Sequence, residues 1–477
     1  NRQDWDGAIA SAQKLADAQT DNALPLVLIG KAYAGKGDVA AAKNAYNEAL
    51  KRNPDFITAT FQLAQIAAVE RDFATAVTLY REVLEKIPGQ ETAASNLARI
   101  LIASKKRDEA VELLEGIRST APRALRARLM LAELYRAEQR WPLALELAQE
   151  AERIAPEDKG MLLVLARAHA ANGASQQAIA TFEKPLEREP DFTEGEFELG
   201  QLEAAVGRPG SARDRFESVL EKEPGNPAAL SALGDLAVAQ GEFEEAMSTA
   251  EKLIQEHPEL PTGYVIKGDA HFRQAQFTEA DAAYAAGLER EPRAGILIGR
   301  YRAHVRMDKR DEGRKLLVDW MSQFPDDASI QYALATSDYV GGEVERSIAG
   351  YEKLLLMNPR HVLGLNNLAN IEFDAGNEGK GIEYARRAFE INALNPKVAD
   401  TYGWILVRTG EREKGLAILE EAARRAPFSM ELQYHIAATL EQIGDKQRAI
   451  QIAKLVVANR QEFPEKAQAK ALLDRLK

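Results

Sequence analysis

Apolar residues recur every three to four positions along the chain, which is the spacing of amphipathic helices, and short polar turns separate the helical segments. In residues 23–56, this spacing predicts a first helix over residues 24–36. Gly37 interrupts that helix, and Asp38 is of the residue type that caps the N-terminus of a second helix. The second helix must end before Pro54, because a residue that precedes proline is disfavoured in the α conformation. The pattern therefore predicts a helical hairpin.

Prolines at the end of each hairpin show that the unit repeats with a period of 34 residues. The regular series is Pro54, Pro88, Pro122, Pro156, Pro190, Pro224, Pro258 and Pro292. The series continues less regularly, with Pro325 after only 33 residues, then Pro359, Ala393 where a proline is due, and Pro427. A fixed period of this length predicts a repeat architecture. Because each unit then packs only on its neighbours, a chain of 477 residues can fold without one large core.

A second pattern concerns residue size, because most units place small residues in the middle of the first helix and early in the second. Examples are Leu63, Ala64, Ala76, Tyr80 and Pro88, then Leu97, Ala98, Ala110, Leu114 and Pro122, and later Leu233, Gly234, Ala246, Leu253 and Pro258. Over essentially the whole chain this pattern resembles the tetratricopeptide repeat. The resemblance implies an all-α fold, a right-handed superhelical solenoid of helix–turn–helix repeats.

Thirteen units follow from this register: 23–56, 57–90, 91–124, 125–158, 159–192, 193–226, 227–260, 261–294, 295–327, 328–361, 362–395, 396–429 and 430–463. They form eight regular repeats over 23–294 and five less regular repeats over 295–463.

The two ends of the chain depart from the repeat. Residues 1–22 fit only the second helix of a truncated repeat, which indicates a fragment of a longer array. Residues 464–477 are predicted to form a capping helix with Ala467, Leu472 and Leu476 facing inward, so we expect a native C-terminus there. Within the array, Pro185 falls inside a second helix and is expected to kink it.

Composition and charge exclude several classes of function. A net charge of −12 and a pI near 5.3 argue against nucleic-acid binding, which needs a basic surface. No run of 18 apolar residues exists, so we expect no membrane insertion by these residues. The absence of cysteine excludes thiolate nucleophiles and Cys-based zinc sites, and no two of the six histidines have the i, i+4 spacing of a metal-binding helix. We therefore predict no catalytic residue, no metal site and no cofactor.

Acidic residues concentrate in one stretch, residues 183–223, which holds twelve acidic and six basic residues. A solvated helix surface explains such a stretch, and a site for a basic partner segment is the alternative.

The family resemblance also predicts where a partner binds. In tetratricopeptide repeats, partner proteins or peptides lie along a concave groove lined by the second, fifth, ninth, twelfth and thirteenth positions of each unit. In the first seven units these positions are mostly small or bland, as at Val27, Ser95, Ala170 and Ala171, with Phe61 and Phe197 as exceptions. The last four units instead contribute Tyr332, Tyr339, Asn366, Asn370, Phe373, Asp400, Trp404, Arg408 and Tyr434.

Those nine groove residues have the chemistry of an interface. Aromatic residues and arginine dominate the energetics of protein–protein contacts, and asparagine can both donate to and accept from a partner's backbone. We therefore expect a protein or peptide segment to bind along the last four repeats. The alternative is that the aromatic residues pack between adjacent repeats.

A narrower resemblance lies near the C-terminus. The strings Leu365-Asn366-Asn367-Leu368-Ala369 and Asp400-Thr401-Tyr402-Gly403-Trp404 are similar to the terminal repeats of bacterial envelope lipoproteins that accompany exopolysaccharide export and the PEP-CTERM protein-sorting system. This resemblance implies a non-catalytic interaction scaffold in the periplasm, anchored to the outer membrane by a lipid. A cytoplasmic adaptor or regulator remains an alternative, as does the recognition arm of an enzyme whose catalytic domain lies outside this sequence.

Overall fold

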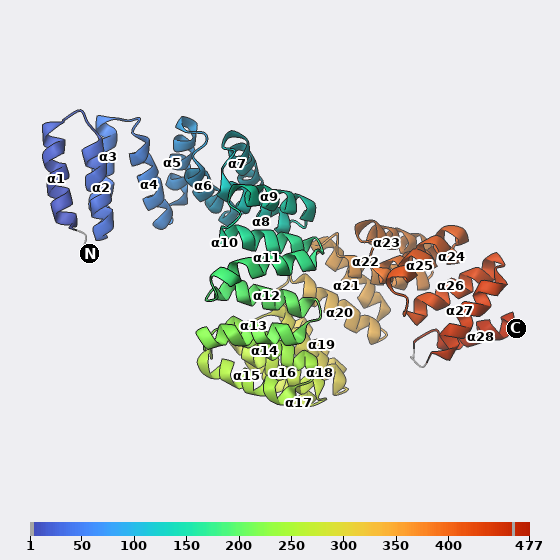
Figure 1. Cartoon of the computed structure of the whole chain (residues 1–477). Coiled ribbons are helices and arrows are strands. Elements are labelled where there is room, and N and C mark those ends of the chain that lie inside the picture. Colours follow the sequence, from blue (N-terminus) through green and yellow to red (C-terminus); the bar gives the residue numbers. More distant parts are fainter. Residues whose placement is uncertain (1–3, 460–462) are drawn as a thin grey trace. The chain divides into compact units, whose positions relative to one another are not determined.

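The computed structural model describes residues 4–459 and 463–477, and over these ranges the chain forms 28 helices and no strand (Figure 1). The chain divides into two compact units, Asn1–Leu236 and Ala237–Lys477, and helix α14 (Pro227–Gln240) spans the division. The all-α repeat fold predicted from the sequence is confirmed. No helix in the described ranges is both long enough and apolar enough to cross a membrane.

Unit 1 consists of helices that are paired in sequence as first and second helices of successive repeats. They are α1 (Trp5–Ala18), α2 (Leu24–Lys36), α3 (Val39–Arg52), α4 (Ile57–Val69), α5 (Phe73–Lys86), α6 (Glu91–Ala103), α7 (Arg107–Thr120), α8 (Leu125–Ala137), α9 (Trp141–Ile154), α10 (Lys159–Ala171), α11 (Ser175–Arg188), α12 (Thr193–Ala205) and α13 (Pro209–Lys222).

Unit 2 continues the same alternation. Its helices after α14 are α15 (Phe243–Glu256), α16 (Thr262–Arg273), α17 (Phe277–Arg290), α18 (Ala294–Arg306), α19 (Arg310–Gln323), α20 (Ala328–Val340), α21 (Val344–Met357), α22 (Val362–Asp374), α23 (Glu378–Ile391), α24 (Pro396–Arg408), α25 (Arg412–Arg425), α26 (Met430–Ile443), α27 (Lys446–Ala458) and α28 (Lys466–Leu476).

Aspartates at equivalent positions begin the second helices of the first repeats. The carboxylates of Asp4, Asp38 and Asp72 each accept a hydrogen bond from the backbone N–H three residues later, at 2.8, 2.9 and 3.1 Å. These bonds satisfy amides that have no partner within the helix. Gly37 ends α2 in the left-handed conformation, with φ of 82°. The predicted helix over residues 24–36 and its neighbouring cap at Asp38 are therefore confirmed.

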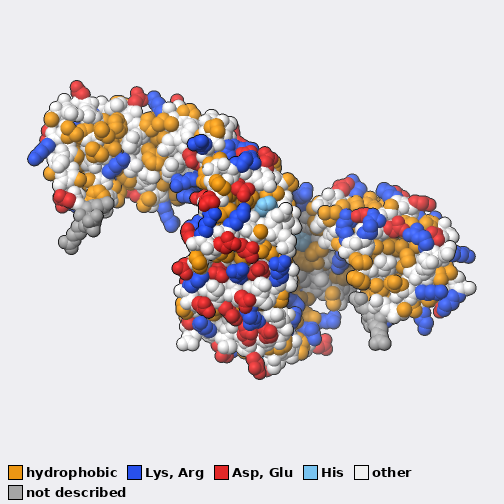
Figure 2. Space-filling model, viewed as in Figure 1, with side chains coloured by type: hydrophobic (Ala, Val, Ile, Leu, Met, Phe, Trp, Pro, Cys, Tyr) orange, Lys and Arg blue, Asp and Glu red, His pale blue; other side chains and the backbone are white. Residues whose placement is uncertain are grey.

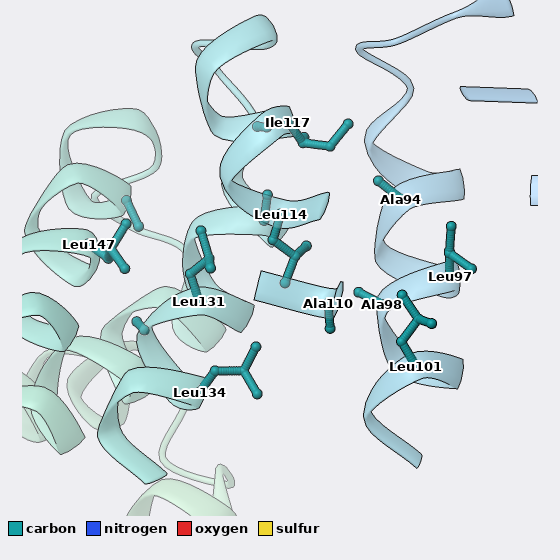
Figure 3. Close-up of a cluster of buried hydrophobic side chains, with 14 of the residues drawn as sticks. Ala94, Leu97, Ala98, Leu101, Ala110, Leu114, Ile117, Leu131, Leu134 and Leu147 are labelled. Carbon is teal, nitrogen blue, oxygen red and sulfur yellow. The ribbon is translucent and has the colours of Figure 1, made fainter. Parts of the chain in front are cut away.

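Small residues allow the two helices of a hairpin to pack closely. A Cβ atom added to Gly30 would lie 2.5 Å from the ring of Tyr46, so only glycine fits against this fully buried tyrosine. In the middle of unit 1, Figure 3 shows how side chains from α6, α7, α8 and α9 fill the space between helices. Ala98 and Leu114 are both completely buried there. In this part of unit 1, one buried cluster thus runs through the successive repeats from α4 to α10.

The irregular spacing of the prolines has a local cause. The connection between α17 and α18 has three residues, 291–293, whereas the connection between α3 and α4 has four, 53–56. Helix α18 consequently begins at Ala294, one residue earlier than the predicted start of its unit. The later connection over residues 392–395 keeps four residues although Ala393 replaces proline, so the register continues unchanged.

Two local expectations concern the proline inside α11 and the buried face of the capping helix α28. Helix α11 continues through the buried Pro185 to Arg188, and the kink expected at this proline stays a prediction. In the capping helix α28, Leu472 is buried as expected, but Ala467 is exposed and its predicted inward position is wrong. Ala469 is buried instead, because it precedes Leu472 by three residues and therefore lies on the same face of the helix.

Candidate partner-binding groove

The first helices of consecutive repeats lie closer together than the second helices. In unit 2, direct contacts join α16 to α18, α18 to α20, α22 to α24, and α24 to α26, and in unit 1 they join α6 to α8 and α8 to α10. Within the described part of the chain, no two consecutive second helices reach a comparable contact. A stack with this asymmetry curves toward its first helices, which therefore line the inner face of each unit.

The strongest cluster of predicted groove residues joins α24 to α26. The ring of Trp404 stacks on the ring of His435, with centroids 4.4 Å apart and planes inclined by 13°. The Nδ1 atom of His435 lies 2.7 Å from Oδ1 of Asp400, and both side chains are buried. Tyr434 lies beside this pair, with its ring centroid 6.3 Å from that of Trp404. The hydrogen bond fixes the imidazole, which in turn supports one face of the tryptophan.

Negative charge accumulates at this end of the groove. Partial burial raises the pKa of the Glu431 carboxyl, and the carboxylates of Asp400 and Glu465 raise it further. His435 and Lys397 oppose this shift in the pKa of Glu431. The α24–α26 end therefore combines an aromatic platform with several carboxylates.

The two predicted asparagines of α22 have different environments. Asn370 donates from Nδ2 to the hydroxyl of Thr401 on α24, at 3.3 Å. Asn366 is completely buried, and neither its Nδ2 nor its Oδ1 has a hydrogen-bond partner among the described residues. An amide buried in this way destabilises the fold unless a partner satisfies it.

Phe373 and Arg408 form a contact between α22 and α24. The Arg408 guanidinium lies 4.4 Å from the centroid of the Phe373 ring, and it also binds Asp374 at 2.9 Å. Phe373 is buried, whereas Arg408 is exposed. Arg408 therefore covers the aromatic ring and presents its charge to solvent.

On α20, Tyr332 and Tyr339 also differ. The hydroxyl of Tyr332 accepts a hydrogen bond from Asn367 at 3.1 Å, and its ring lies 5.2 Å from the imidazole of His361. Tyr339 is 45% exposed, the most accessible large apolar side chain of the nine predicted groove residues.

The structure thus brings the nine predicted residues onto four consecutive first helices, α20, α22, α24 and α26. Tyr339 and Arg408 are exposed, and Tyr332, Asn370, Trp404 and Tyr434 are half-buried. Asn366, Phe373 and Asp400 are buried, so they support the groove from behind in this conformation. Packing between repeats, the alternative considered for the aromatic residues, does occur at Trp404. Partner binding by these residues stays a prediction.

A hollow in unit 1 was missed by the sequence reasoning. A pocket of about 740 Å³ opens between α8, α10 and α12, and its lining includes Arg136, Arg167, Ala170 and Phe197. Nε of Arg167 donates to Glu198 at 2.7 Å, which fixes the guanidinium at the edge of the pocket. The sequence signals at this place are the small groove residues Ala170 and Ala171 and the exceptional Phe197, but they do not reveal that the neighbouring helices leave a hollow.

The acidic stretch 183–223 lies on α11, α12 and α13, where Figure 2 shows Asp and Glu side chains gathered on the visible face. Part of it serves the fold, because Glu196 binds Lys222 at 2.9 Å and Arg215 at 3.4 Å. In residues 4–459 and 463–477, no group of three or more His, Asp or Glu side chains is placed to hold a metal ion.

Comparison of the sequence with models of known protein families identifies the type of repeat. A family model described as tetratricopeptide repeat matches residues 27–91, 332–396 and 403–465, and a second model with the same description matches residues 69–134 and 203–262. Together these matches cover more than half of the chain, and neither model describes an enzyme. A comparison with curated proteins gives no significant match.

Solved structures give distant similarities. One is the crystal structure of the APC/C hetero-tetramer Cut9–Hcn1, with 15% identity, a TM-score of 0.43 and coverage of 98% of each chain. Another is Naa15/Naa10 bound to HypK-THB, with 14% identity and a TM-score of 0.41, covering 100% of this chain and 89% of the other. The repeated helical hairpins and the family matches lead to one conclusion: the chain belongs to the tetratricopeptide-repeat proteins.

Proposed function

We propose that this protein is a non-catalytic scaffold that binds a segment of a partner protein along the first helices α20, α22, α24 and α26. The observation that carries this proposal is the Trp404–His435–Asp400 cluster, which holds a half-buried indole rigidly at the inner face. A preorganised aromatic side chain loses little conformational entropy when a partner covers it, so it favours tight association.

Neighbouring side chains extend the proposed contact surface. Tyr339 is exposed on α20, and Asn370 and Tyr434 are half-buried on α22 and α26. A partner segment that crosses these helices would meet aromatic surface at both ends and an amide in the middle. This arrangement fits an extended or helical peptide that offers apolar side chains and backbone polar groups.

Affinity capture with matched variants tests the groove. Tyr339→Ala combined with Trp404→Phe removes one aromatic side chain and shrinks another, and it keeps a ring to pack on His435. Phe428→Ala is the control, since Phe428 is 85% exposed in the turn before α26. We expect the double variant to lose partner affinity by about thirtyfold, the effect of a typical hot spot, while the control retains it. Equal capture by both variants would contradict the groove assignment.

We also propose that the scaffold works in the bacterial envelope, in the periplasm, as part of an exopolysaccharide-export or protein-sorting system. Support for this setting comes from the resemblance of the strings around Asn366 and Trp404 to envelope lipoproteins. Fractionation of the full-length protein tests it directly. Recovery with the outer membrane or the periplasm is expected, and recovery only in the cytoplasm would overturn this part of the proposal.

A further inference from the structure

A concentration of positive charge stands out in this acidic protein. Residues 293–315 contain eight basic and three acidic residues, although the whole chain carries a net charge of −12. Two of the basic residues, Arg302 and Arg306, are exposed one turn apart on α18. Helix α18 is a first helix that contacts α16 and α20 directly, so both arginines belong to the inner-face layer of unit 2.

Aromatic rings hold these two guanidinium groups in place. The Arg302 guanidinium lies 4.9 Å from the ring centroid of Phe272 on α16. That of Arg306 lies 4.5 Å from the ring of Phe277 and 5.9 Å from that of Phe272. The two rings pack edge to face, 5.4 Å apart. Cation–π stacking orients a guanidinium without consuming its N–H donors, so these donors stay available to an acceptor.

The nearby carboxylates are engaged by other residues. Asp281 lies 2.7 Å from Nε of Arg300 and 3.2 Å from the imidazole of His304. Asp269 accepts a hydrogen bond from the hydroxyl of Tyr284 at 2.6 Å. In the part of the chain that the structure describes, no carboxylate forms an ion pair with Arg302 or Arg306. The positive charge of this pair is therefore not neutralised within the protein.

We infer that Arg302 and Arg306, backed by Phe272 and Phe277, form a docking site for an acidic peptide segment of a partner protein. Planar guanidinium groups match the geometry of carboxylates, and two of them at i, i+4 spacing can receive two acidic side chains. An acidic peptide fits better than nucleic acid, because a long polyanion would be repelled by the surrounding net negative charge and would need a longer basic stripe.

This site goes beyond the proposed groove, since α16 and α18 carry none of its nine residues. An acidic segment bound at α18 and an apolar segment bound along α20–α26 could belong to one partner. Each contact can nevertheless be measured alone.

Fluorescence anisotropy with a labelled glutamate-rich peptide tests the acidic-peptide site, using the whole chain at low ionic strength. Arg302→Gln/Arg306→Gln is expected to weaken binding by about tenfold, the combined effect of two exposed ion pairs. Lys353→Gln/Lys454→Gln is the control, because it removes the same charge from exposed positions on α21 and α27. Circular dichroism establishes that both variants fold.

The possible outcomes separate the two proposals. Loss of the peptide by the arginine variant alone supports the site, whereas equal affinities of both variants overturn it. Tighter binding of a single-stranded oligonucleotide than of the peptide overturns the assignment of an acidic peptide. The Tyr339→Ala/Trp404→Phe variant is expected to bind the glutamate-rich peptide normally. If that variant also captures its partner normally, the proposed groove fails while the arginine site stands.

Discussion

Two neighbouring asparagines on α22 allow a test in which the same substitution has opposite effects. Asn366 is completely buried without a hydrogen-bond partner among the described residues. Asn367, its neighbour, donates to the hydroxyl groups of Tyr332 and Tyr351 at 3.1 and 2.9 Å. We predict that Asn366→Leu stabilises the protein and that Asn367→Leu destabilises it.

The magnitudes follow from the hydrogen bonds that each residue makes. Removing the unsatisfied amide of Asn366 should recover a desolvation cost of about 1–3 kcal/mol. Leucine adds roughly 0.5 kcal/mol of helix propensity at either position. Asn367→Leu loses two hydrogen bonds that contribute about 1 kcal/mol each, so its net effect is a loss of about 1–2 kcal/mol. The free energies of unfolding of the two variants should therefore differ by roughly 4 kcal/mol.

Native-state hydrogen exchange is the suitable assay, because repeat arrays unfold in steps and a single midpoint does not report on one helix. The exchange free energy of amides in α22 should rise in Asn366→Leu and fall in Asn367→Leu. A lower exchange free energy in Asn366→Leu would refute the reasoning, since it would mean that the amide is satisfied in solution. If Asn366 is kept for partner binding, the stabilised variant should capture the partner less well.

Two further predictions concern helix packing and acid stability. Gly200→Ala should destabilise α12 by about 1 kcal/mol, because the added methyl group would lie 2.7 Å from the ring of Phe216. Gly210→Ala should instead stabilise α13 by up to about 1 kcal/mol, because the added methyl group would have nothing within 4 Å. Chemical denaturation of both variants checks the signs, and destabilisation by both would contradict the packing account. The Arg118 guanidinium lowers the pKa of Glu150 from its usual 4.5, so this interaction stabilises the fold above about pH 4.5 and is lost as the pH falls through the lowered pKa. The Glu150→Gln variant should therefore be less stable at neutral pH and should lose less stability on acidification. A pH dependence of stability equal to that of the unsubstituted protein would contradict this prediction.

The sequence predicted the repeat architecture well because its signals are local and recur many times. The helix over residues 24–36 and the cap at Asp38 each follow from one unit's own residues. The missing residue near Pro325 was harder to place. Proline marks the connection between helices, so its spacing does not reveal that residues 291–293 are the shortened connection.

The groove was predicted only in outline, because burial depends on neighbouring repeats. The fifth position of a unit was expected to face the partner, yet Val27, Ser95 and Asn366 are buried at that position. A sequence register gives the direction of a side chain but not the size of its neighbours. For the same reason the arginine pair on α18 escaped notice, since its aromatic support comes from α16 and α17.

Site-specific photo-crosslinking measures the central claim most directly, namely that a partner protein lies on the inner face of the last repeats. A photoreactive amino acid would replace Tyr339 on α20 or, as a control, Glu383, which is exposed on the second helix α23. In cells that express the full-length protein, we predict one dominant adduct from position 339 and none from position 383. The same adduct from both positions, or an adduct only from 383, would contradict the account.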